Sequence, residues 1–136
     1  MIEIVHTPID VAKVLESIAD PSAGAIDLFI GATRNTAEGK RVLWLEYEAY
    51  LPMVLEQIQR LVQEATSHWN LCKVTIIHRV GKVGIGEASV VIGVSSSHRK
   101  EAFEGCRFLI DNLKKTVPIW KKEVFEQKEE WVHLHE

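Results

Sequence analysis

Strand-type segments that follow one another without an intervening helix constrain the fold of this chain most strongly. Residues 25–30 and 42–50 are β-type runs joined by a polar loop, and residues 74–80 and 88–94 are joined by a segment with three glycines. Strict alternation of strand and helix, as in a doubly wound fold, is therefore absent. The order β-α-β-β-α-β-β-α-β-β predicts an α+β fold with a mixed, mostly antiparallel sheet and helices on one face.

Three segments carry apolar residues at helical spacing. The first helix is expected to be capped by Thr7 with Pro8 at its first position, and the second to start at Pro52. The third follows the serines at 95–97 and should end before Pro118, with Val117 already extended. Its predicted buried stripe is Ala102, Cys106, Leu109, Ile110 and Leu113.

The C-terminal segment predicts a β-hairpin in which residues 119–125 pair with residues 131–134 across an acidic turn. Alternation in the earlier strand 42–50 places Val42 with Trp44 on one side and Leu45 with Tyr47 on the other. The segment 81–86 is expected to be a flexible or tightly turned connection. The segment 33–40 should be a loop.

Length and charge exclude several classes of protein. The 136 residues form one expected domain, residues 1–136, and the net charge of −3 argues against a nucleic-acid binder. The two cysteines form no C-x-x-C pair, no apolar run approaches the length of a membrane helix, and the N-terminus does not resemble a signal peptide. We therefore expect a cytoplasmic, reduced protein that binds neither nucleic acid nor membrane.

The segment 95–123 is the first candidate for a functional site, as a pocket for a small anion. His98 and Arg99 stand where an apolar strand leads into a helix, and free N–H groups at a helix start attract anions. A capping serine with solvated neighbours explains the same residues about equally well.

A group of basic residues follows the third helix. Lys114 lies at the end of that helix, where a lysine also complements the helix dipole, so a purely structural role explains it well. Lys121 lies in an extended segment, where Lys121 and Glu123 share one face and Lys122 takes the other. A lysine among apolar groups and other cations loses its proton more readily and can act as base or nucleophile.

Other residues give weaker signals. Arg34, just past a buried strand, suits an anionic ligand but is equally an ordinary surface arginine. His133 and His135 could be a metal pair but lack a third ligand, so no metal site is expected. His78 and Cys106 are interpreted as structural, and Cys72 lacks the basic surroundings of a catalytic thiol.

Five motifs in order and spacing resemble the large, catalytic subunit family of molybdopterin synthase. They are Gly31-x-x-Arg34, Leu45-Glu46-Tyr47-Glu48-x-Tyr50-x-x-Met53, Ile77-His78-Arg79-x-Gly81, Ser97-His98-Arg99-x-x-Ala102-Phe103, and Leu113-Lys114-x-x-x-Pro118-x-Trp120-Lys121-Lys122-Glu123. The resemblance spans nearly the whole chain. It implies an α/β hammerhead fold and a sulfurtransferase without a cofactor.

The resemblance also implies substrates, partners and site residues. Two sulfurs would pass from the C-terminal Gly-Gly thiocarboxylate of a small, ubiquitin-like carrier subunit to cyclic pyranopterin monophosphate (precursor Z), forming the dithiolene of molybdopterin. A homodimer of this chain with one carrier at each end would form a heterotetramer. Lys114 and Lys121 match the catalytic positions, and His135 stands near a position that reaches the neighbouring subunit's pocket. The matches to substrate-pocket positions are Arg34, Thr33, Ala32, His98, Arg99, Lys122 and Glu123.

Overall fold

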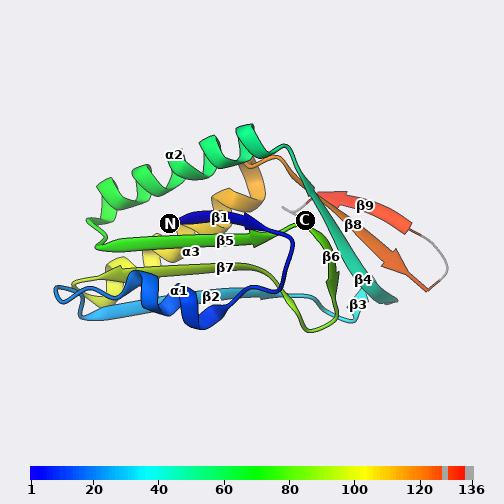
Figure 1. Ribbon diagram of the computed structural model, residues 1–136, viewed down its shortest axis with the longest axis horizontal. Helices are drawn as coiled ribbons and strands as arrows, with labels where there is room; N and C mark the ends of the chain where they lie inside the picture. Colours follow the sequence, from blue (N-terminus) through cyan, green and yellow to red (C-terminus); the bar gives the residue numbers. More distant parts are fainter. Residues whose placement is uncertain (127–128, 134–136) are drawn as a thin grey trace.

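Two β-sheets and three helices make up the part of the chain that the computed structural model describes, residues 1–126 and 129–133 (Figure 1). The predicted α+β class with mixed, mostly antiparallel pairing is confirmed. The helices are α1 (Val11–Ile18), α2 (Leu51–Trp69) and α3 (Arg99–Thr116). The strands are β1 (Ile2–Val5), β2 (Ala25–Ala32), β3 (Thr36–Ala37), β4 (Lys40–Ala49), β5 (Lys73–Arg79), β6 (Gly81–Gly84), β7 (Ala88–Ser96), β8 (Ile119–Phe125) and β9 (Glu129–His133).

The first sheet has four strands in the order β1-β5-β7-β2. Its β1 and β5 are parallel, and the other two pairs are antiparallel. The central strand β7 is buried along almost its whole length, as its run of valines and isoleucines predicts. Strand β2 lies at the edge of this sheet and runs alongside β7 from Ala25, opposite Ser96, to Ala32, opposite Ala88.

Helices cover both faces of this sheet, which corrects the expectation of helices on one face only. Helices α2 and α3 contribute Val54, Ile58 and Leu109 to the main core, while α1 contributes Val14 to a smaller cluster on the opposite face. Figure 1 shows α1 in front of the strands and α3 behind them. The eight residues of α1 give too short a pattern to indicate which face the helix covers.

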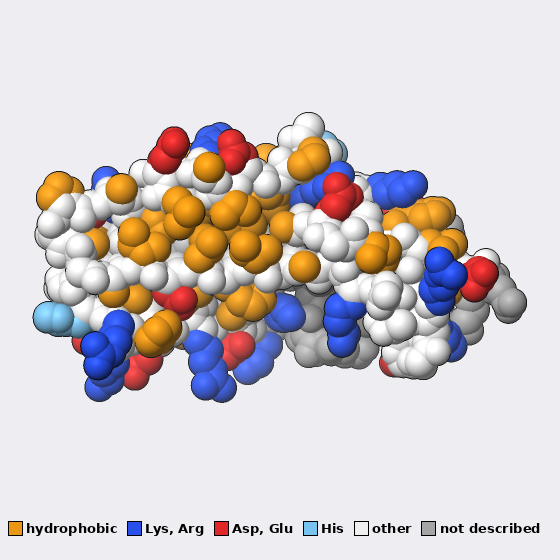
Figure 2. Space-filling model, turned by 90° about the horizontal axis from the view of Figure 1, so that it is seen from below, with side chains coloured by type: hydrophobic (Ala, Val, Ile, Leu, Met, Phe, Trp, Pro, Cys, Tyr) orange, Lys and Arg blue, Asp and Glu red, His pale blue; other side chains and the backbone are white. Residues whose placement is uncertain are grey.

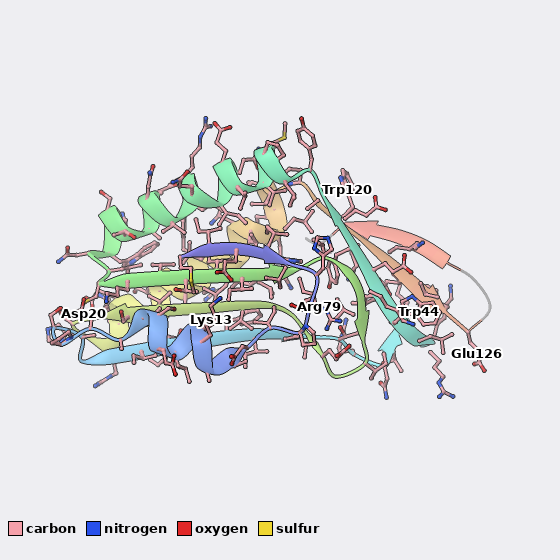
Figure 3. All side chains as sticks on the ribbon, viewed as in Figure 1. Lys13, Asp20, Trp44, Arg79, Trp120 and Glu126 are labelled. Carbon is pink, nitrogen blue, oxygen red and sulfur yellow. The ribbon has the colours of Figure 1, made fainter. Side chains whose placement is uncertain are left out.

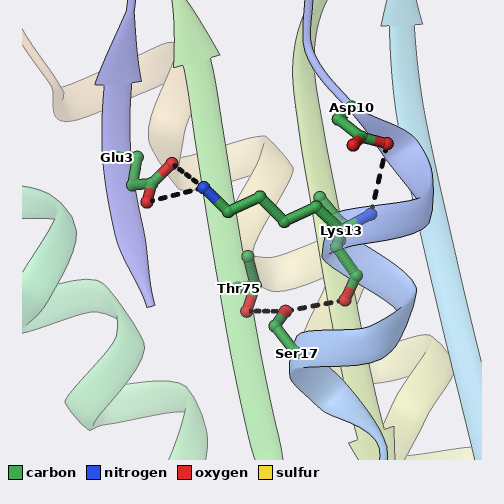
Figure 4. Close-up of polar contacts among 6 residues, drawn as sticks. Glu3, Asp10, Lys13, Ser17 and Thr75 are labelled. Atoms are coloured by element: carbon green, nitrogen blue, oxygen red, sulfur yellow. Dashed lines mark hydrogen bonds and ion pairs between the residues drawn. The ribbon is translucent and has the colours of Figure 1, made fainter.

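Asp10, and not Thr7, caps α1. The Asp10 carboxylate accepts a hydrogen bond from the Lys13 backbone N–H at 3.3 Å, so the helix begins later than predicted. Figure 4 shows how α1 is then fastened to the sheet: the Lys13 amine pairs with Glu3 of β1 at 3.2 Å, and Ser17 meets Thr75 of β5 at 2.7 Å.

The second sheet has five strands: four in the order β3-β4-β8-β9, and β6, which pairs with the middle of β4. The predicted hairpin of β8 with a later strand is confirmed, although β9 begins at Glu129. Two short strands were not predicted, because β3 lies in the expected loop and β6 in the expected glycine connection. Their pairing with β4 supplies hydrogen bonds that short local patterns do not reveal.

A β-bulge changes the predicted faces of β4. Val42 lies opposite Phe125 and Trp44 lies opposite Val124, so two steps along β4 match one step along β8. The extra residue shifts the alternation, and Val42 joins Leu45 and Tyr47 in the core instead of facing outward with Trp44. At the other end of the sheet, Val117 has the predicted extended backbone and leads directly into β8.

Candidate active site

A pocket of about 150 Å³ lies between the two sheets beside the last turns of α3. Residues from both sheets and from α3 line it. We call it the lysine pocket and define it by Arg34, Tyr47, His78, Lys114, Lys121 and Glu123. Its described lining holds three cationic side chains and one carboxylate, so the pocket favours an anionic ligand.

Strand β8 supplies Lys121 and Glu123. Side chains two residues apart on a strand share a face, and the Lys121 amine lies 3.6 Å from a Glu123 carboxylate oxygen. Glu123 is 7% exposed, which makes it a buried counter-ion. The antiparallel register places Tyr47 of β4 opposite Lys121 and Leu45 opposite Glu123, so these four side chains form one wall.

Helix α3 supplies Lys114 from its last turn. The predicted buried stripe of this helix is confirmed, and its last member, Leu113, is 1% exposed and also lines the lysine pocket. Packing of Leu113 fixes the end of the helix against the sheets. The neighbouring Lys114 is thereby placed at the rim of the pocket.

The end of β2 supplies Ala32 and Arg34. Between them, Thr33 is buried and does not line the pocket. Its N–H donates to the Glu87 carbonyl at 3.0 Å and its carbonyl accepts from Gly86 at 2.9 Å. Thr33 therefore anchors the chain, while the residues on either side of it face the pocket.

Lys122 does not line the lysine pocket, and the reason is strand alternation. Its amine lies 3.0 Å from Glu46 on the outer face of the second sheet. Glu46 also accepts a hydrogen bond from the Trp44 indole at 3.1 Å, and these two partners lower the pKa of the Glu46 carboxyl. Trp44 is labelled on this sheet in Figure 3. A direct contact of Lys122 with a ligand in the pocket has no support in this arrangement.

His98 and Arg99 lie at the opposite end of α3 from Lys114, which corrects the expectation of one pocket within one chain. The helix between Arg99 and Lys114 is about 22 Å long, because each residue adds about 1.5 Å. His98 instead lines a separate, open hollow beside His68, Trp69 and Glu104. A substrate-binding role for His98 and Arg99 stays a prediction.

Two lining residues, His78 and Tyr47, were not predicted as site residues. His78 is 2% exposed, and its ring packs edge-on against Tyr47 with centroids 5.1 Å apart. Burial lowers the pKa of His78 to about 4 and raises the pKa of Tyr47. The sequence signal was present, because both residues belong to the motifs quoted above, but a histidine inside an apolar strand is most often a core residue.

The described residues contain no candidate metal site. Among the residues that the structure describes, no three His, Cys, Asp or Glu side chains lie together as a metal site. The pair considered earlier is not tested, since His135 lies outside the described residues together with Leu134 and Glu136. Within the described chain no helix combines the length and apolar character needed to cross a membrane.

Comparison with known proteins identifies the family of this chain. Residues 4–116 match the family model described as MoaE protein. The chain belongs to the MoaE protein family. A molybdopterin synthase catalytic subunit of Arabidopsis thaliana is 48% identical over 123 residues, which are 90% of this chain and 62% of that protein. The MoaE chain described here thus spans less than two thirds of that relative's length.

Two bacterial proteins match more of their own length. A molybdopterin synthase catalytic subunit of Bacillus subtilis is 44% identical over 130 residues, which are 96% of this chain and 83% of that protein. A crystal structure of molybdopterin synthase from Staphylococcus aureus superposes with a TM-score of 0.91 at 36% identity, covering 96% of this chain and 95% of that chain. The fold of this MoaE chain is therefore that of a known molybdopterin synthase structure.

Proposed function

We propose that this chain is the catalytic subunit of molybdopterin synthase, a cytoplasmic sulfurtransferase that converts precursor Z to molybdopterin. The observation that carries this proposal is the lysine pocket, where Lys114 and Lys121 from separate elements meet Arg34 in one anion-attracting site. The similarity to molybdopterin synthase catalytic subunits over 90% or more of the chain supports the same reaction.

The three cationic side chains of the lysine pocket bind two different anionic groups, a phosphate and a thiocarboxylate. Arg34 can form two parallel hydrogen bonds with the cyclic phosphate of precursor Z. Lys114 and Lys121 neutralise the thiocarboxylate at the end of a carrier subunit, and a lysine that releases its proton can act as nucleophile or base there. Before a ligand binds, the Glu123 carboxylate balances the positive charge of Lys121.

The sulfur arrives on the partner in this scheme, because no cysteine among the described residues lines the lysine pocket. Cys106 is buried in the core, where burial raises the pKa of its thiol to about 12. One thiocarboxylate holds one sulfur, so two carrier molecules serve each precursor Z. The carrier is a separate small protein with a C-terminal Gly-Gly, and its tail enters the pocket.

The edge strand β2 is the surface we assign to the homodimer. Ile26 and Ile30 of β2 are 52% and 44% exposed. Figure 2, which views the molecule from the side of β2, shows a broad hydrophobic area there. Exposed apolar side chains on a sheet edge are unfavourable in water and suit a second copy of the same strand.

Such a dimer gives His98 and Arg99 a role in the site. β2 begins beside Ser96, close to the start of α3, and ends beside the lysine pocket. Two antiparallel copies of β2 related by a two-fold axis bring the start of one strand next to the end of the other. His98 and Arg99 would then approach the pocket of the second copy. With one carrier at each end, the assembly is a heterotetramer.

Reconstitution tests the proposal. The chain is mixed with thiocarboxylated carrier and precursor Z, and the dithiolene product is measured. Product formation that is nearly abolished in Lys114→Ala and in Lys121→Ala, with folding and carrier binding retained, is the expected result. If the wild-type chain binds precursor Z but forms no product, it is a binding module and the transferase assignment is wrong.

A further inference from the structure

His78 lines the lysine pocket, yet the transfer chemistry above gives it no part. Its Nδ1 lies 2.8 Å from the backbone carbonyl oxygen of Arg79. A carbonyl oxygen only accepts hydrogen bonds, so the contact requires the proton on Nδ1. The neutral ring then carries its lone pair on Nε2, and His78 offers the pocket a hydrogen-bond acceptor.

Contacts on two sides hold the ring in place. Nδ1 is tied to the backbone of β5, and the ring packs at 72° against Tyr47, which stands opposite Lys121 across β4 and β8. Among the described residues, no hydrogen-bond partner of Nε2 is found. Because Nε2 is the ring end remote from the backbone contact, it is the atom left for a ligand.

The charged side chains of the pocket differ from His78 in their hydrogen bonding. Arg34, Lys114 and Lys121 only donate hydrogen bonds, and Glu123 carries a full negative charge 3.6 Å from the Lys121 amine. A neutral acceptor differs from a second carboxylate because it does not neutralise the lysines. The pocket also holds the hydroxyls of Thr36, Tyr47 and Ser89, which can both donate and accept. The Nε2 atom of neutral His78 differs from them because it can only accept, which suits an N–H group.

We propose that His78 is a specificity-determining residue whose Nε2 accepts a hydrogen bond from an N–H of the pterin ring. This inference rests on the proposed function, since it assigns a subsite within the same pocket. Precursor Z presents a phosphate to the cations and N–H groups on its ring system. His78 recognises the ring, while Arg34 and the lysines hold the charged parts.

Burial keeps the acceptor available. Removal of the imidazole from water disfavours its charged form and lowers the pKa of His78 to about 4. At neutral pH the Nε2 lone pair is therefore free of a proton. A site that hydrogen-bonds an N–H group discriminates strongly against analogues that lack it, because the buried acceptor is then left unpaired.

Two variants separate the acceptor from the backbone contact. In His78→Asn the side-chain amide can still donate to the Arg79 carbonyl but does not reach the Nε2 position. In His78→Gln the amide oxygen reaches that position. Calorimetric titration with precursor Z should show binding weakened about tenfold in His78→Asn and less than about threefold in His78→Gln, since one hydrogen bond is at stake. Equal losses in the two variants, or none in His78→Asn, would overturn the inference.

Nitrogen NMR of the wild-type ring provides a readout independent of turnover. Nε2 should be unprotonated in the free chain, and its resonance should move when precursor Z is added without carrier. The second arm uses carrier that ends in an ordinary carboxylate, which should leave the resonance in place. A shift with carrier alone, or bound precursor Z with an unmoved Nε2, contradicts the proposal for His78 only. If precursor Z does not bind at all, the proposed function fails as well.

Discussion

Lys121 and Lys122 are adjacent in sequence, yet their amines lie on opposite faces of the five-stranded sheet. The Lys121 amine lies 3.6 Å from Glu123 inside the lysine pocket, and the Lys122 amine lies 3.0 Å from Glu46 on the outer face. Strand geometry makes this separation unavoidable. The chain therefore contains its own matched pair for testing which positive charge the reaction uses.

Replacement of Lys121 by methionine is expected to lower the rate of molybdopterin formation by at least about 100-fold, because one preorganised charge at the reacting group is removed. Lys122→Met removes the same charge one residue away and should keep the rate within about threefold. Single-turnover assays with thiocarboxylated carrier compare the two variants. Similar losses in both would show that the reaction needs the total charge of β8 and not the pocket-facing amine.

Arg34→Lys should raise the KM for precursor Z about tenfold with little change in kcat. The guanidinium can hold a phosphate by two hydrogen bonds in a plane, whereas an ammonium acts as a point charge. A change confined to KM indicates an interaction made equally in ground state and transition state. Arg60→Lys is the control, because Arg60 lies on the exposed side of α2 in a surface pair with Glu56. If kcat falls and KM stays constant, Arg34 belongs to the chemical step instead.

Local pattern was sufficient to predict much of the fold. The stripe of α3, the extended Val117 and the two faces of β8 follow from spacing alone, and the structure agrees with each. The side of the sheet that α1 covers and the bulge at Val42 depend on distant partners, which spacing does not identify. The separation of Arg99 from Lys114 was predictable, since the helix that joins them was itself predicted. In the proposed dimer, Arg99 of one copy would approach Lys114 of the other.

Gly93 on β7 lies directly beneath two core side chains of α1. A Cβ atom at this position would lie 2.8 Å from Val14 and 2.9 Å from Ile18, both fully buried. Gly93→Ala is therefore expected to lower the free energy of unfolding by about 1–3 kcal/mol, as overpacking of a core does. Urea unfolding measures this change.

The double variant Gly93→Ala with Val14→Ala tests the cause of that loss. Removing the Val14 methyl groups makes room for the new Cβ, so the double variant should lose less than the sum of the two single variants. Strictly additive losses would place the cost of the alanine elsewhere than in contact with α1.

Stability should fall between pH 7 and pH 5.5, because His78 is buried in its neutral form. The pKa of His78 is about 4 in the folded chain and lies below the usual 6.5. Between these two values the unfolded chain binds a proton on this histidine and the folded chain does not. The stabilisation is present above pH 6.5 and is lost as the pH falls toward 4. Linkage gives a loss of about 1 kcal/mol between pH 7 and 5.5 from this histidine.

Replacing His78 by glutamine removes that titration and should flatten the pH dependence by the same amount. His6→Gln, at an exposed position, is the matched control and should leave the slope of the wild-type chain nearly unchanged. Urea unfolding at pH 7.0 and 5.5 provides the comparison. Above pH 5 most carboxyl groups stay ionised, so their titration contributes little within this window. If His78→Gln has the wild-type slope, the imidazole is not held neutral in the fold, and it could not serve as the acceptor that the lysine pocket requires.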